Sequence, residues 1–202
     1  MARPLFICFW AVSIISLASS VNNYEKPIDT QRSSLVIHVR KAGLLSAAGH
    51  EHWIDAPLSD GSVDDVSAMR SVRFSVNAAK LTVMADKNVS AKDLAEVQSN
   101  MQNKVLESSK YPNIAFYSTR VEPVGDDFWR VEGNLTLHGK TRRVMVDVKR
   151  LKDAYTGRAR ISQSDFHIQP VQIAGGLVKV KNELEIQFNV YVMSSPEISA
   201  PQ

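Results

Sequence analysis

The sequence predicts a mainly β domain with a single amphipathic helix, and two patterns of apolar residues carry that prediction. Several stretches alternate apolar and polar residues with the period of two that a β-strand requires. One stretch, residues 90–106, instead spaces its apolar residues at helical intervals. The chain has 202 residues, 44% of them hydrophobic and 22% charged, so we expect one globular domain with a sizeable core.

Residues 1–20, MARPLFICFWAVSIISLASS, have the features of a secretory signal peptide. Arg3 gives a short basic start, and an apolar run from Leu5 to Ala18 ends in small residues. The run falls short of the roughly 20 residues that a membrane-spanning helix needs, although a permanent N-terminal anchor remains the alternative. We therefore expect a periplasmic or secreted protein. Its mature chain would lack the single cysteine, Cys8, which excludes disulfides and cysteine-ligated metals.

The remaining chain divides by composition into three parts. Residues 21–33 form a polar leader, residues 34–193 the β domain, and residues 194–202 a flexible C-terminal tail. Lysines and arginines are spread among acidic residues along the chain and are not gathered into a stripe, so we expect no nucleic-acid partner.

Six alternating stretches define the β domain. The first, SLVIHVRKA at residues 34–42, places Leu35, Ile37 and Val39 on one face. Similar alternation occurs at residues 70–78, 113–119, 127–150, 155–164 and 182–192. The fourth stretch contains a hairpin that turns at His138-Gly139-Lys140, and Gly133 within it indicates a bend or a bulge. Together these stretches make seven or eight antiparallel strands.

The helix is expected from Ser90 to Leu106. Ser90 followed by Asp93 is a capping-box start. The helix must end before Pro112, because the residue preceding a proline is biased out of the helical region. Its apolar stripe consists of Leu94, Val97, Met101 and Val105. Such a stripe needs an apolar surface to pack on, and the open end of a barrel offers one.

Alternation alone leaves the architecture open. Seven or eight strands can form a sandwich or a closed barrel. A barrel of about eight strands is either filled by its own side chains or wide enough for one slender ligand. The pattern also does not determine which face of every strand points inward.

Several segments resemble the YceI-like lipid-binding proteins. GNLTLHGKTRRVMVDV (residues 133–148) is similar to the signature hairpin of that family, KYPNIAFYSTRVEP (110–123) and ISQSDFHIQP (161–170) to two further segments, and GGLVKVKNELEIQFNV (175–190) to its closing strand. SLVIHVRKAGLLSAAGHEHWI (34–54) resembles the first two strands of a subgroup that carries Gly-His-x-His. The segments occur in the family's order between Gln31 and Val192. Segment 161–170 departs from the family pattern, because His167 stands where the family has a small glycine. This difference puts the local rim geometry in doubt.

The resemblance implies an eight-stranded antiparallel, lipocalin-like β-barrel with the amphipathic helix near one end. It also implies a periplasmic carrier that needs no cofactor and holds a polyisoprenoid, a fatty-acyl compound or another long-chain lipid inside the barrel. Among the apolar residues of the strands, we predict that the interior wall is made by Phe74, Ile114, Phe116, Trp129, Leu135, Val146, Ile186 and Phe188.

The string AAGHEHWI at residues 47–54 is the most unusual in the chain. We predict that His50, His52, Trp53 and His167 form a polar rim that binds the head group of a ligand. The alternative is a metal or haem site, because two histidines two residues apart on a strand point to the same face. A metal would need a further ligand, and the candidates are His38, His138, His167, Glu51 and Asp165.

The remaining features argue against catalysis. The chain has no Gly-x-Ser-x-Gly elbow, no phosphate-binding loop and no dinucleotide fingerprint, so we do not expect an enzyme. His138 is interpreted as a turn residue whose imidazole projects to solvent. Lys140, Arg142 and Arg143 leave transient contact with a membrane surface open. A homodimer, and a filled scaffold barrel that acts only through its surface, also remain open.

Overall fold

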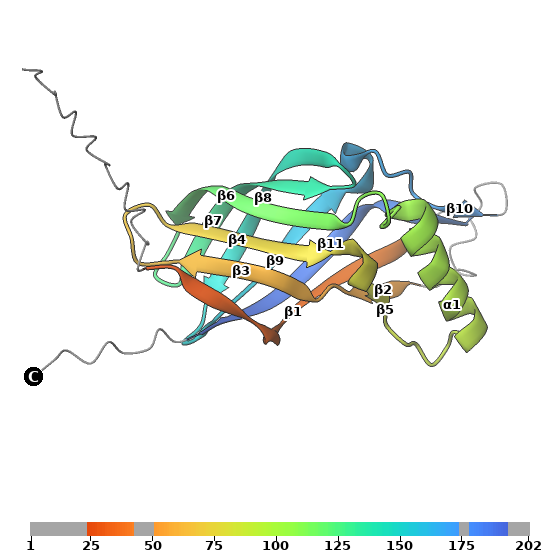
Figure 1. Ribbon diagram of the computed structural model, residues 1–202, viewed down its shortest axis with the longest axis horizontal. Coiled ribbons are helices and arrows are strands. Elements are labelled where there is room, and N and C mark those ends of the chain that lie inside the picture. Colours follow the sequence, from red (N-terminus) through yellow and green to blue (C-terminus); the bar gives the residue numbers. More distant parts are fainter. Residues whose placement is uncertain (1–23, 43–50, 174–177, 194–202) are drawn as a thin grey trace, which may run out of the picture.

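The computed structural model describes residues 24–42, 51–173 and 178–193. They form a closed antiparallel β-barrel of eight strands (Figure 1), which confirms the predicted fold class. Every strand is antiparallel to its neighbours, and closure comes from pairing of the first barrel strand with the last. In order around the barrel, the strands are β1 (Lys26–Ala42), β3 (Leu58–Asp64), β4 (Ser71–Asn77), β6 (Asn113–Pro123), β7 (Phe128–Leu137), β8 (Lys140–Arg150), β9 (Ala154–Ser162) and β11 (Val178–Val192).

Three short strands extend one end of the barrel. They are β2 (His52–Asp55), which pairs with the second half of β1, β5 (Thr82–Val83), which pairs with β2, and β10 (Gln172–Ile173), which pairs with β11. Strand β1 begins at Lys26, so residues 26–33, assigned to a polar leader on sequence grounds, are its first part. Alternation is less regular there, and a register shift lies between Asp29 and Ser34.

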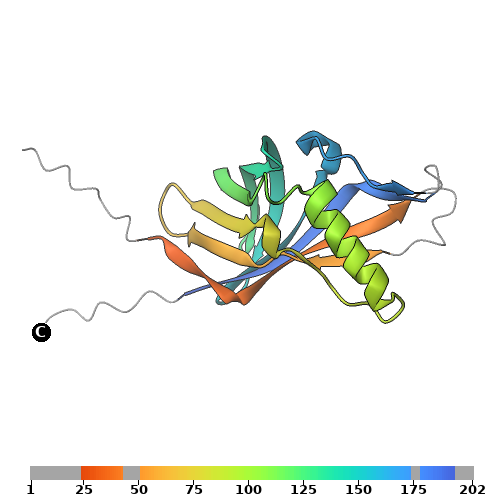
Figure 2. The ribbon, with the colours of Figure 1, turned by 45° about the vertical axis from the view of Figure 1, so that its right-hand side comes forward.

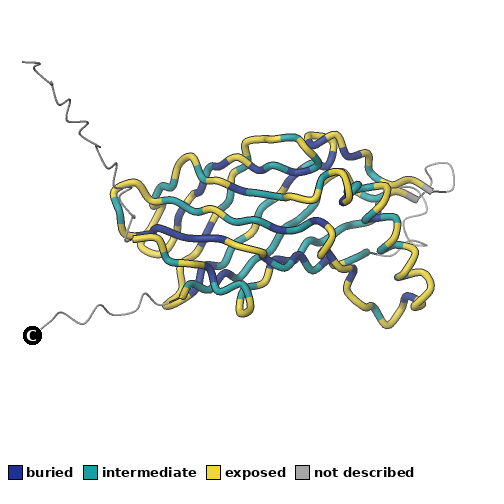
Figure 3. Tube along the Cα trace, in the orientation of Figure 1, coloured by how far each residue is buried: buried dark blue, intermediate teal, exposed yellow. Residues whose placement is uncertain are grey.

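The alternating residues face the barrel interior on every long strand, and Figure 3 shows the resulting mixture of buried and accessible positions along each strand. Leu35, Ile37 and Val39 of β1, for example, all point inward. The irregularity expected at Gly133 is present, but the extra residue lies on the partner strand. The register between β6 and β7 shifts between Ser118 and Arg120, directly opposite Gly133.

Helix α1 (Ala91–Asn100) continues as a π-helical turn, Met101–Val105, and so matches the predicted helix. The Ser90 hydroxyl accepts a hydrogen bond from the Asp93 N–H at its start. Figures 1 and 2 place α1 at the end of the barrel near β2, β5 and β10, which we name the helix end. In the described part of the chain, no helix has both the length and the apolar composition needed to cross a bilayer.

Two glutamines attach the helical segment to the backbone just before and within β5. The Gln98 side chain accepts a hydrogen bond from the Val83 N–H and donates one to the Leu81 carbonyl. Gln102 donates to the carbonyls of Leu81 and Ala78, the latter in the 3₁₀ turn Ala78–Lys80. These hydrogen bonds add to the packing of Leu94, Val97 and Val105, which are partly buried against the hydrophobic core.

Strands β8 and β9 pair over only part of their length. Only four residue pairs join these strands, from Asp147 to Arg150 on β8. The 3₁₀ turn Gln163–Phe166 packs against β8, β9 and β11 and covers the remaining gap. Phe166 of this turn is 1% exposed and belongs to the hydrophobic core.

Candidate functional site

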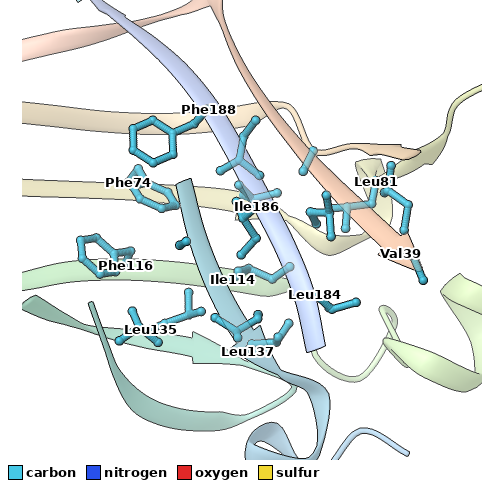
Figure 4. Close-up of a pocket in the computed structure, with 18 of the residues that line it drawn as sticks. Val39, Phe74, Leu81, Ile114, Phe116, Leu135, Leu137, Leu184, Ile186 and Phe188 are labelled. Atoms are coloured by element: carbon cyan, nitrogen blue, oxygen red, sulfur yellow. The ribbon is translucent and has the colours of Figure 1, made fainter. Parts of the chain in front are cut away.

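The interior of the barrel contains an apolar cavity of about 510 Å³. Its size lies within the range of about 300–1,000 Å³ that is usual for small-molecule sites. Side chains from all eight barrel strands line it, together with residues of the helical segment. Figure 4 labels wall residues from β1, β4, β6, β7 and β11. A ligand inside would therefore contact mainly hydrocarbon.

The structure places all eight residues predicted for the interior on the wall of this cavity. They come from five strands and are Phe74, Ile114, Phe116, Trp129, Leu135, Val146, Ile186 and Phe188. Sequence reasoning did not assign the helical residues Val97, Met101 and Val105 to this wall, although their shared stripe was recognised.

The accessibility of the inward-facing side chains shows where the barrel is hollow. Ile37, Ile114, Ile186 and Phe188 point inward, yet they are only partly buried. In a filled core such residues would lose nearly all their accessible surface. Trp129 and Val131, farther from the helix, are fully buried by their neighbours. Open space therefore borders the partly buried side chains of the cavity wall.

Two glycines make room for aromatic rings inside the wall. The Phe116 ring lies where a side chain at Gly133 would project, and a Cβ there would also come within 2.7 Å of the Tyr117 carbonyl oxygen. The Phe188 ring similarly occupies the space next to Gly157, its cross-strand partner. Both rings can lie close to the sheet because the glycines have no side chain.

A buried polar network closes the end of the barrel opposite the helix, which we name the closed end. The Asp65 carboxylate, 1% exposed, accepts hydrogen bonds from Lys26 Nζ at 2.7 Å and from the Tyr155 hydroxyl at 2.8 Å. Arg150 lies 3.4 Å from the same carboxylate. Tyr155 and Trp129 form the adjoining cavity wall, with ring centroids 5.7 Å apart.

These contacts perturb two ionisable groups. Burial alone raises the pKa of Asp65, but the hydrogen bonds from Lys26 and Tyr155 and the charges of Lys26 and Arg150 outweigh it and hold that pKa below its usual range. Burial, followed by the hydrogen bond to Asp65 and the charge of Asp65, raises the pKa of the Tyr155 hydroxyl well above its usual range. At neutral pH the network therefore contains an ionised carboxylate and a neutral phenol.

Polar and charged residues also join the cavity wall at the helix end. On the strand side they are Lys41, His52 and Lys179, and on the helix Asp93, Glu96 and Asn100. An amphiphile with its chain in the cavity would place a polar group among these residues.

Of the four residues predicted for the rim, the structure describes three, and these three do not come together. His52 lines the cavity, whereas His50 lies outside the described residues. Trp53 is 39% exposed on the outer surface and stacks on His38 with ring centroids 4.1 Å apart. His167 is an exposed residue that ends the 3₁₀ turn Gln163–Phe166, with a φ of 60°. This left-handed conformation suits the glycine that the family resemblance led us to expect at this position.

The other candidate ligands do not gather around His52 to form a metal site in the described residues. His38 Nε2 lies 2.9 Å from Glu51 Oε2 on the outer surface, away from the cavity wall. Among residues 24–42, 51–173 and 178–193, no group of three or more His, Cys, Asp or Glu side chains could hold a metal ion.

The interpretation of His138 requires a correction. It does lie in the tight turn before Gly139, with φ angles of 51° and 68° at the two residues. Its imidazole does not project to solvent, because the side chain is only 11% exposed. One ring nitrogen lies 2.9 Å from Glu107 Oε2 and the other 3.2 Å from the Phe166 carbonyl oxygen. His138 thus joins the turn after the helix to the segment that covers the β8–β9 gap.

Comparison with known proteins identifies relatives of the whole barrel. The model of the YceI-like domain family matches residues 27–192. A UPF0312 protein of Vibrio cholerae is 25% identical over 190 residues, covering 87% of this chain and 92% of that protein. A UPF0312 protein of Pectobacterium atrosepticum is 29% identical over 150 residues, covering 74% of this chain and 73% of the relative.

Two solved structures share the fold. BcnA of Burkholderia cenocepacia superposes with a TM-score of 0.64 at 20% identity, covering 83% of this chain and 99% of that chain. A polyisoprenoid binding domain from Saccharophagus degradans, implicated in plant cell wall breakdown, gives a TM-score of 0.56 at 14% identity, with coverage of 85% and 99%. These similarities support the barrel architecture.

Proposed function

The chain belongs to the YceI-like domain family, and from this premise and the hollow barrel we propose that it is a non-enzymatic binding protein that holds a long apolar lipid-like molecule. The observation that carries the proposal is the apolar cavity of about 510 Å³ with inward-facing side chains that remain accessible. A polyisoprenoid or a fatty-acyl compound is the ligand class we favour. A structural relative described as a polyisoprenoid binding domain supports that choice.

The energetics favour a flexible hydrocarbon over a polar ligand. Each methylene transferred from water to an apolar site contributes about 0.8 kcal/mol, so a chain of about a dozen carbons gains roughly 10 kcal/mol. Ordering the chain and losing its free motion offset part of that gain, by about 4 kcal/mol or more. The remainder is sufficient for stable binding without any hydrogen bond inside the cavity.

The polar residues at the helix end suggest the orientation of the ligand. Its chain would lie in the cavity, and its head group would lie near His52, Lys41 and the helical residues Glu96 and Asn100. We further propose that residues 1–20 direct the protein to the periplasm, and that the Gly-His-x-His string of residues 49–52 marks a subgroup of the family.

The test is binding of geranylgeraniol and stearic acid to the purified protein, followed by native mass spectrometry. We expect a one-to-one adduct with at least one of the two. Ile186→Trp, which adds an indole to the cavity wall, should abolish the adduct. Gln187→Trp is the matched control. Gln187 follows Ile186 directly, but its side chain lines a groove on the outer surface. A wild-type protein that takes up neither compound would contradict the proposal.

A further inference from the structure

Three phenylalanines from three strands form a row inside the barrel, and we name them the phenylalanine belt: Phe74, Phe116 and Phe188 (Figure 4). Phe74 and Phe116 are direct cross-strand partners. Their rings stack with centroids 5.3 Å apart and planes inclined by 22°. Figure 4 shows the belt on the side of the cavity away from Val39, Leu81 and helix α1.

The wall around the belt holds the rings in place. Phe116 is packed over Gly133 and Phe188 over Gly157, so both rings already occupy the only recesses that these glycines leave in the sheet. Phe74 rests on Phe116. A ligand chain reaching the belt therefore meets rings that have no further space behind them to move into.

The cavity extends to both sides of the belt, because Trp129 and Tyr155 also line it. Toward the helix, Ile114, Leu184 and Ile186 are aliphatic and only partly buried, so they border open space. Toward the closed end, the wall includes the bulky rings of Trp129 and Tyr155, which are fully buried against their neighbours. Phe74 and Phe188 are themselves only partly buried.

We propose that the phenylalanine belt limits how deeply a hydrocarbon chain enters, and thereby selects ligands by chain length. The inference rests on the proposed function, because it assumes that the chain enters from the helix end. The Asp65 network makes the opposite entry unfavourable, since a chain would have to displace a buried charged group.

The experiment measures affinity for a homologous series of saturated primary alcohols by displacement of N-phenyl-1-naphthylamine. For the wild type, each added methylene should strengthen binding roughly fourfold until the chain reaches the belt, after which affinity should stop rising. Phe74→Leu and Phe188→Leu should each move this plateau to longer chains, with little change for the shortest alcohols. Either variant alone is sufficient if the other does not fold.

Two controls separate the belt from general effects on the barrel. Phe128→Leu makes the same substitution at a phenylalanine that is 50% exposed on the outside, and it should leave the plateau unchanged. Ile114→Phe narrows the aliphatic section and should weaken binding of short and long chains alike. A plateau that stays at the same length in both folded belt variants would overturn the length limit and leave the proposed function standing. Failure of every alcohol to bind the wild type would overturn both.

Discussion

Removing the hydroxyl of Tyr155 tests the polar network at the closed end of the barrel. In Tyr155→Phe, Asp65 loses the hydrogen bond that it accepts at 2.8 Å and keeps Lys26 and Arg150 as partners. Tyr155 is 6% exposed, and the Asp65 side chain is 1% exposed. Water therefore cannot readily replace the missing donor.

The expected loss follows from the type of hydrogen bond. A hydrogen bond to a charged group contributes about 1.5–3 kcal/mol to stability. The ring of Tyr155 and its packing against Trp129 are unchanged by the substitution, so the loss should be confined to this term. For a protein of this size, that corresponds to a decrease in Tm of roughly 3–12 °C.

Urea unfolding followed by tryptophan fluorescence at pH 7 measures the effect. Tyr117→Phe is the matched control, because Tyr117 is 58% exposed and should tolerate the change with almost no loss. The difference between wild type and Tyr155→Phe should narrow in acid, where Asp65 becomes protonated and the hydrogen bond is no longer charge-assisted. A loss in Tyr155→Phe no larger than that of the control would refute the role assigned to the network.

Three further predictions concern Asp65, the barrel wall and the helix. The pKa of Asp65 is lowered on folding, so its ionised carboxylate should stabilise the protein fully above about pH 4. This contribution should disappear as the pH falls through the folded-state pKa of Asp65. The free energy of unfolding of wild type and of Asp65→Asn, compared across an acid titration, measures the contribution. Gly157→Ala should lower the free energy of unfolding by about 1–3 kcal/mol in urea, since its Cβ would collide with the adjoining ring and a backbone carbonyl, whereas Gly125→Ala has space and should be neutral. Gln98→Ala should accelerate hydrogen exchange of the α1 amides, because it removes two hydrogen bonds to residues 81–83, while Lys92→Ala on the exposed face should not.

The interior wall was predictable because alternation is a local property of each strand. Phe188 and Ile186 lie two residues apart, so assigning one to the interior assigns the other as well. Closure of the strands into a barrel required the family resemblance, since the same alternation suits a sandwich. The helix was equally predictable from the sequence, because both its apolar stripe and its Ser90 cap are local features of the chain.

Contacts between distant residues were not predictable in the same way. Asp65 and Tyr155 are 90 positions apart, and neither stands in a motif. His138 was assigned to the correct turn, but its burial depends on Glu107 and Phe166, which lie about 30 positions away on either side. Trp53 follows His52 directly and was grouped with it, although adjacent residues on a strand point to opposite faces.

A hollow interior has an energetic consequence for the whole protein. Unfilled volume inside a protein is destabilising, because the side chains of the wall lack the contacts that a filled core would give them. The stability of this barrel should therefore depend strongly on what occupies it, and a bound chain should raise its Tm by contributing the missing contacts as well as by mass action. The same dependence explains why the charged network matters at the closed end. Where the core contributes less, a fixed and fully paired carboxylate that joins β1, β8 and β9 to the turn after β3 helps to keep the empty barrel from collapsing.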